Sequence, residues 1–164
     1  MTPHCSGLAT LAAGLDIVRR ARDQRLYLIL AFSLALVLAL LGVLHVFWAL
    51  GGGLGFGSVL PEVSGRRVFT PGPTATFAVA LALFVASAIV LGRAGLFGSH
   101  ASAEHFKWPV FILGFAFLIR AVGEGNLVGF TKRVRDTSFA RWDTRLFSPL
   151  CLAISYAALW LAFR

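Results

Sequence analysis

Charged residues are scarce in this 164-residue chain, and their scarcity restricts the protein class most strongly. Asp, Glu, Lys and Arg make up 13% of the sequence, whereas soluble domains average ~25%. Acidic residues are the rarest, at seven against fifteen basic ones, and hydrophobic residues reach 58%. A soluble protein of this composition would expose large apolar patches and aggregate, so the sequence argues against a soluble globular enzyme.

Cysteines and catalytic motifs are also few. The two cysteines, Cys5 and Cys151, form no C-x-x-C pair, so neither a disulfide framework nor a thiolate metal site is indicated. The chain has no P-loop and no H-E-x-x-H, and its glycine cluster does not follow a strand in the G-x-G-x-x-G pattern. We therefore expect no metal ion and no cofactor.

The chain contains four long apolar stretches. They cover residues 26–50, 74–91, 108–122 and 146–163. A bilayer core ~30 Å thick is crossed by ~20 helical residues, so each stretch is read as a membrane span. The sequence thus predicts an all-α, polytopic protein of the cell membrane, with a four-transmembrane-helix bundle over residues 26–164.

Residues 1–25 precede the first span and form the second predicted unit. Leu8, Leu11, Leu15 and Val18 recur at helical spacing, which predicts a short N-terminal interfacial helix; a disordered tail is equally compatible. Four arginines lie between residues 19 and 25 and favour a cytoplasmic N-terminus. The net charge is +8, but such clusters beside spans are typical of contact with membrane lipids, and no nucleic-acid-binding motif accompanies them.

Glycine and proline mark the expected ends of the spans. The glycine-rich run at residues 51–57 ends the first span, since each glycine costs ~1 kcal/mol in a helix relative to alanine. Arg93 is expected just outside the second span. Ser148 and Pro149 look like an N-cap and a first helical residue of the fourth span. Loop one, between the first two spans, is expected to fold over one mouth of the bundle.

Loop three runs from about residue 123 to residue 145, between the third and fourth spans. Polar residues gather at the mouth of the bundle that loops one and three share. His45 lies inside the end of the first span, where ionisable side chains are costly and usually face the bundle interior. Arg120 and Glu124 are four residues apart on one helix face, so an ion pair between them is expected. Asp143 comes shortly before the fourth span. These four residues form a candidate polar pocket under loops one and three.

The candidate pocket has two interpretations. In the chemical one, His45, Glu124 and Asp143 exchange protons as general acids and bases, and Arg120 binds an anion. In the structural one, the histidine hydrogen-bonds a neighbouring helix and the charged residues cap helix ends. Candidate ligand-binding residues at the same mouth are Trp48, Lys132 and Ser148.

Seven short segments carry a family resemblance: residues 45–52, 59–61, 69–71, 120–123, 128–132, 139–143 and 148–151. Together they resemble a family of small four-span bacterial integral membrane proteins known as a domain of unknown function. Members often have an acid and an aromatic after an Arg-x-x-Gly element, whereas this chain has Glu124 and Gly125 there. The resemblance implies a four-helix membrane bundle and no particular activity.

Three functions are compatible with this pattern. A non-enzymatic accessory or lipid-binding bundle is favoured, because the chain is small and lacks catalytic signatures. The alternatives are a membrane-embedded acid–base enzyme, such as an isomerase or cyclase of a lipophilic substrate, and a small oligomeric transporter. The partners expected are membrane lipids, a lipophilic small molecule, and a membrane protein partner or a second copy in a homo-oligomer; no nucleic acid is expected.

Overall fold

A computed structural model describes residues 4–53, 62–63, 66–67, 71–98 and 103–164 of the chain. Its elements in chain order are α1 (His4–Ala49), β1 (Glu62–Val63), β2 (Arg66–Arg67), α3 (Pro73–Arg93), the 3₁₀ turn η1 (Glu104–Phe106), α5 (Lys107–Val122), α6 (Ser138–Trp142), the π-helical turn η2 (Asp143–Phe147) and α7 (Ser148–Phe163). The strands form one short antiparallel pair. Helices dominate, so the all-α prediction is confirmed.

Four described helical stretches are long and apolar enough to cross a membrane: Ala13–Ala49, Pro73–Arg93, Glu104–Val122 and Ser138–Phe163. Each contains one of the four spans expected from the sequence. Many of their outward-facing side chains are large and apolar, as suits a surface that faces lipid rather than water. The chain is therefore a multi-pass, four-helix membrane protein.

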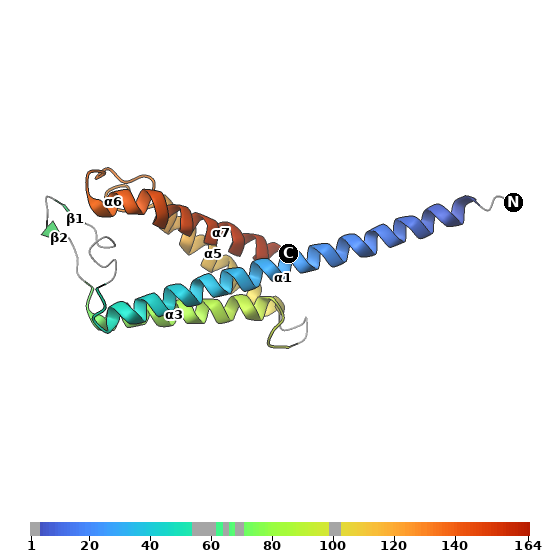
Figure 1. Ribbon diagram of the computed structural model, residues 1–164, viewed down its shortest axis with the longest axis horizontal. Coiled ribbons are helices and arrows are strands. Elements are labelled where there is room, and N and C mark those ends of the chain that lie inside the picture. Colours follow the sequence, from blue (N-terminus) through green and yellow to red (C-terminus); the bar gives the residue numbers. More distant parts are fainter. Residues whose placement is uncertain (1–3, 54–61, 64–65, 68–70, 99–102) are drawn as a thin grey trace.

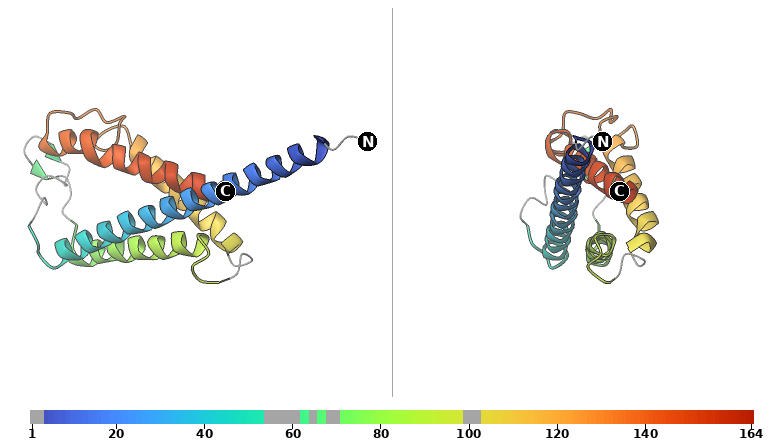
Figure 2. Two further views of the ribbon diagram at one scale, coloured as in Figure 1. Left: turned by 45° about the vertical axis from the view of Figure 1, so that its right-hand side comes forward. Right: turned by 90° about the vertical axis from the view of Figure 1, so that its right-hand side faces the viewer.

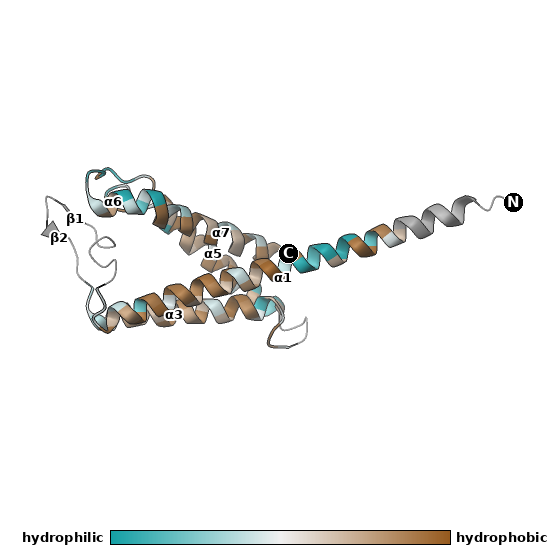
Figure 3. Cartoon of the chain, viewed as in Figure 1, coloured by the Kyte–Doolittle hydropathy of each residue, from teal (hydrophilic) through white to brown (hydrophobic). Residues whose placement is uncertain are grey.

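Helix α1 is much longer than a bilayer is thick. Its 46 residues span about 70 Å at the usual rise per residue, against ~30 Å for the hydrocarbon core. Figure 3 shows mainly hydrophobic residues where α1 runs beside α3, and hydrophilic residues alternating with hydrophobic ones on the stretch beyond the bundle. The segment expected as a separate interfacial helix is helical but continues directly into the first span. Its location at the membrane surface, and the boundary at residue 25, stay predictions.

The four long helices form two antiparallel pairs, α1 with α3 and α5 with α7, as Figure 1 shows. The pairs touch near the C-terminal end of α7, where the Tyr27 and Trp160 rings lie 6.1 Å apart. From there they diverge toward the end that carries α6, as the left view of Figure 2 also shows. The bundle is thus closed at one end and spread at the other.

One face of α1 lines the interior of the bundle. Tyr27, Ala31, Leu34, Leu38 and Leu41 alternate between steps of four and three residues and belong to the hydrophobic core or pack against it. This is the spacing of a coiled-coil seam, which keeps one helix face turned toward its neighbours. The next two positions in that spacing are residues 45 and 48, so the seam extends toward the spread end.

Small residues let α1 and α3 approach closely. Ser87 of α3 donates a hydrogen bond from its hydroxyl to the Ala35 carbonyl of α1, at 2.8 Å. A side chain at Gly42 would meet the Phe84 ring. In a membrane, helices associate mainly through such packing and interhelical hydrogen bonds.

The first span ends at the glycine-rich run, as predicted. Gly51 has φ 94°, and the Gly51 and Gly52 amides donate to the Trp48 and Phe47 carbonyls at 3.0 and 2.9 Å. This is a Schellman motif, in which a glycine in the left-handed region terminates the helix. The expected placement of loop one over the mouth concerns residues 54–61, 64–65 and 68–70, which lie outside the described residues.

The fourth span begins ten residues before the predicted N-cap, so that prediction is wrong. Thr137 is the cap: its hydroxyl accepts from the Ala140 amide at 3.1 Å. Helical structure then runs on through η2 into α7. Pro149 has no N–H to donate to the preceding turn, and that turn is widened into a π-helical one, with the Ser148 amide donating to the Asp143 carbonyl. The Ser148 side chain is buried inside the protein, where its hydroxyl donates to the Asp143 carboxylate.

Candidate functional site

Asp143 is the centre of the largest group of buried polar residues in the described part of the chain. Its side chain is fully buried, at 0% exposure, in the first position of η2. The helix that carries it starts at the Thr137 cap, and the π-helical turn adds a residue just before α7. These local features turn Asp143 inward, toward the C-terminal end of α5.

Four donors surround the Asp143 carboxylate. Arg120 Nη2 lies 2.9 Å from Oδ1. The other oxygen, Oδ2, accepts from the Gly129 amide at 2.8 Å, from Lys132 Nζ at 2.9 Å and from the Ser148 hydroxyl at 3.2 Å. A carboxylate offers about four lone-pair sites, and the protein itself supplies four donors, three of them to Oδ2. We call Arg120, Gly129, Lys132, Asp143 and Ser148 the Asp143 cluster.

Lys132 is buried as completely as the carboxylate it pairs with, at 2% exposure. Besides Asp143, its Nζ atom donates to the Gly129 carbonyl at 2.9 Å and to the Thr144 hydroxyl at 2.7 Å. An ammonium group has three donors, and all three have partners. Lys132 therefore joins the end of loop three to η2 and presents no free donor to a ligand.

The loop that supplies Gly129 and Lys132 folds back onto the end of α5. The Phe130 and Thr131 amides donate to the Ala121 and Val122 carbonyls at 2.9 and 3.1 Å. These carbonyls belong to the last turn of α5 and lack helical partners, so the loop satisfies them. The reversal holds the Gly129 amide against the carboxylate.

Two glycines make this reversal possible. Gly123 and Gly129 have φ 89° and 82°, in the left-handed region that favours glycine. A Cβ on Gly129 would overlap Gly123 and the Val122 carbonyl, and one on Gly123 would overlap the Val128 carbonyl. The two backbone segments touch directly, with no space for a side chain at either position.

The charges of the cluster do not cancel. Arg120 and Lys132 bring two positive charges to a single carboxylate. Arg120 Nη1 is buried and has no hydrogen-bond partner among the described residues, although the side chain as a whole is 37% exposed. Burying ions is costly unless they are paired and hydrogen-bonded, and most of the cluster meets that condition. The arrangement resembles a structural clamp more than a site for exchanging protons.

The other residues predicted for the pocket lie outside the cluster. His45 Nδ1 is 2.7 Å from the Leu41 carbonyl of its own helix, and its ring lies 5.1 Å from that of Trp48. Glu124 is exposed, accepts from the Leu127 amide at 3.3 Å, and does not pair with Arg120, so the predicted ion pair is wrong. Arg120 turns instead to the buried Asp143, which offers it a partner away from solvent. Whether any of these residues carries chemistry stays a prediction.

A second buried cation, Arg93, joins the helix pairs at the closed end. It was expected just outside the second span, but it is the last residue of α3 and only 7% exposed. Its guanidinium donates to the Leu161 and Ala162 carbonyls of α7 at 3.2 and 3.4 Å, and to the Glu104 carboxylate at 3.0 Å. Tyr27 of α1 donates to the Arg93 carbonyl at 3.0 Å. One residue thereby links three of the long helices.

Sequence reasoning identified Arg120, Lys132, Asp143 and Ser148 as candidates, and the structure brings these four together. It missed Gly129, which takes part through its backbone N–H and C=O, and Arg93, which donates mainly to backbone carbonyls. The sequence signals available were that Gly129 is a glycine in a charged loop and that Arg93 is an arginine beside an apolar stretch. Neither signal predicts which group the residue contacts.

Comparison with known proteins gives one match. The family described as "Protein of unknown function (DUF3995)" matches over residues 38–158, which include the whole Asp143 cluster. No curated protein and no solved structure matches the chain. Because the match covers well over half of the sequence, the chain belongs to this family of unknown function.

Proposed function

We propose that the chain is a non-enzymatic membrane protein, an accessory bundle that binds lipids and membrane-embedded partners through its outer faces. The observation that carries the proposal is the burial of Asp143 and Lys132 among hydrogen-bond partners from the protein itself. Both are buried, and their oxygens and ammonium donors bond to the protein's own groups. A general acid or base must be within hydrogen-bond reach of a substrate proton. Lys132 has no free donor, and the Asp143 carboxylate, which already accepts four bonds, is closed off from solvent.

The locations of His45 and Glu124 support the same proposal. The histidine bonds within α1, and the glutamate is exposed at the start of loop three. An acid–base enzyme would need one of them beside the carboxylate of Asp143. The structural interpretation of the polar residues is therefore favoured over the chemical one.

The apolar outer surface supplies the binding faces that the proposal requires. Leu40, Val43, Leu44 and Phe47 line a shallow groove of about 340 Å³ on α1. Leu40 and Val43 are 58% and 57% exposed. Their spacing of three and four residues forms one stripe along the helix, of the kind that contacts an acyl chain or another helix in the membrane.

Mass spectrometry of small molecules that co-purify with the protein tests the proposal. The samples are the wild type and the variants His45→Ala and Glu124→Gln, each also scored for complementation of a deletion strain. We expect the same unmodified membrane lipids from all three and full complementation by both variants. A lipophilic compound whose amount or structure changes with either substitution, together with lost complementation, would establish an enzyme and refute the proposal.

A further inference from the structure

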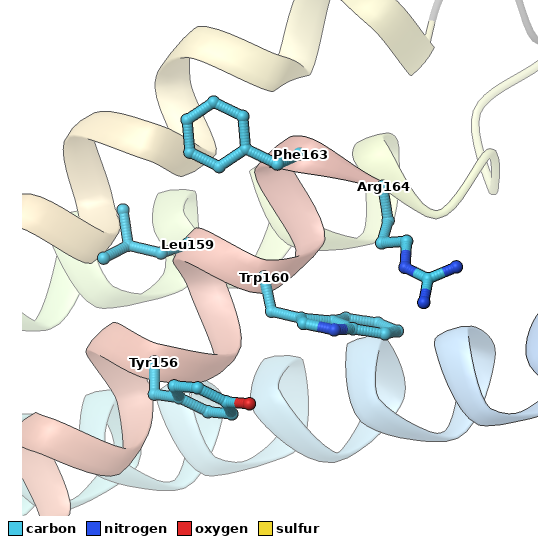
Figure 4. Close-up of a pocket in the computed structure, with 5 residues that line it drawn as sticks. All are labelled: Tyr156, Leu159, Trp160, Phe163 and Arg164. Atoms are coloured by element: carbon cyan, nitrogen blue, oxygen red, sulfur yellow. The ribbon is translucent and has the colours of Figure 1, made fainter.

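A groove at the closed end of the bundle differs from the purely apolar groove on α1. It has a volume of about 350 Å³ and is lined by Tyr156, Leu159, Trp160, Phe163 and Arg164, as Figure 4 shows. Tyr156 and Phe163 are 71% and 67% exposed. Its lining combines aromatic and aliphatic walls with one cation at the end of α7.

The cation is oriented by an aromatic ring. The Arg164 guanidinium carbon lies 5.1 Å from the centre of the Trp160 ring, which is within the range of a cation–π contact. A cation–π contact does not use the hydrogen-bonding capacity of the guanidinium N–H donors. Among the described residues Arg164 has no ion pair or hydrogen bond. These donors are therefore available for a bidentate contact with a phosphate.

The groove lies at the C-terminal end of a membrane-spanning helix, beside further positive charge. It is at the end of a span, where tryptophan and tyrosine rings favour the interface. Trp160 contacts Tyr27, and the stretch of α1 before Tyr27 leaves the bundle at this point. That stretch carries four arginines between residues 19 and 25, against the acids Asp16 and Asp23. The surroundings thus favour an anionic ligand over a zwitterionic one.

From this combination we infer a specific site for an anionic glycerophospholipid in the leaflet where α7 ends. The phosphate binds the guanidinium edge of Arg164. One acyl chain lies along Tyr156, Leu159 and Phe163. This inference deepens the proposed function, on which it rests, by naming the lipid class and its place on the bundle.

Native mass spectrometry of the full chain in a neutral detergent tests the site. Phosphatidylglycerol and phosphatidylcholine with identical acyl chains are titrated against wild type, Arg164→Gln and Arg145→Gln. Arg145 is an exposed cation on η2, so its substitution removes the same charge away from the groove. We expect Arg164→Gln to weaken phosphatidylglycerol binding about tenfold, as the loss of a charge-assisted contact does, and to leave phosphatidylcholine binding unchanged. Arg145→Gln should bind both lipids like the wild type.

A second variant and a soluble headgroup complete the test. Tyr156→Ala shortens the apolar wall and should weaken binding of both lipids. Glycerol 3-phosphate, which has no acyl chain, should not compete with phosphatidylglycerol. Equal phosphatidylglycerol binding by wild type and Arg164→Gln, an equal loss in Arg145→Gln, or effective competition by glycerol 3-phosphate would overturn the inference. Each of these results leaves the non-enzymatic role intact. A lipophilic compound altered in the His45→Ala sample, together with lost complementation, refutes that role and not the lipid site.

Discussion

Lys132 Nζ lies 2.9 Å from Asp143 Oδ2, and both side chains are buried. The two residues are eleven positions apart, one in loop three and one at the start of η2. Their ion pair thus fixes the charged loop onto the last membrane helix. Because each charge has left water, removal of either partner leaves the other buried and uncompensated.

Asp143→Asn should destabilise the protein strongly. The amide keeps the shape of the carboxylate but leaves Lys132 and Arg120 without a negative partner. We expect a loss of about 3–5 kcal/mol in the free energy of unfolding, the usual cost of breaking a buried ion pair. Denaturant unfolding in detergent measures it. Asp136→Asn is the matched control, since this exposed carboxylate lies in the same loop, and it should stay within about 0.5 kcal/mol of the wild type. Similar unfolding of both variants would show that the pair contributes little.

Gly129→Ala should destabilise more than Gly125→Ala. Both glycines have positive φ, at 82° and 88°, so an alanine is strained at either position. Only at residue 129 would the new Cβ also strike backbone, whereas nothing lies within 4 Å of it at residue 125. We expect about 1–2 kcal/mol for the control, from backbone strain alone, and a clearly larger loss for Gly129→Ala. Thermal unfolding of the two variants, side by side, measures the difference. Equal losses would mean that the loop does not pack as closely as described.

Arg93→Met should loosen the closed end of the bundle. Methionine preserves the apolar stem but removes the donors to the Leu161 and Ala162 carbonyls. We expect a loss of about 1.5–3 kcal/mol, typical of hydrogen bonds made by a charged group, with faster hydrogen exchange in the last turn of α7. Glu104→Gln alters only the partner that is 65% exposed, and should cost about 0–1 kcal/mol. If Glu104→Gln is as harmful as Arg93→Met, the surface ion pair and not the carbonyl contacts holds this end.

The class of the fold was readable from the sequence because apolar length is a direct requirement of the bilayer. Each of the four predicted spans coincides with a described helical stretch, and the glycine-rich run ends α1 as expected. The start of the fourth span was not readable. Ser148 and Pro149 have the sequence of a helix start, but the preceding residues form helical turns, and the Asp143 cluster compensates the burial of the Asp143 carboxylate in them.

The members of the Asp143 cluster were only partly predictable, because their contacts depend on the tertiary structure. The charge pattern predicted that Arg120, Lys132 and Asp143 lie at the same mouth of the bundle. Which of them form ion pairs depends on the direction in which the chain leaves each helix. Sequence spacing placed Glu124 beside Arg120 on a regular helix, whereas α5 ends at Val122 and Gly123 turns the chain away. His45 shares the mouth but lies on the other helix pair, and the divergence of the pairs is a tertiary feature that no local pattern reveals.

Amine labelling offers the most direct test that the Asp143 cluster is a closed structural clamp. The chain has two lysines, Lys107 and Lys132, so the half-buried Lys107 is an internal reference for the buried one. A water-soluble acylating reagent is added to folded protein, and modification is read by peptide mass spectrometry. We expect Lys107 to react and Lys132 to stay unmodified, with Asp143→Asn raising the reactivity of Lys132. Equal labelling of the two lysines in the folded wild type would contradict the closed cluster and favour an open, ligand-accessible pocket.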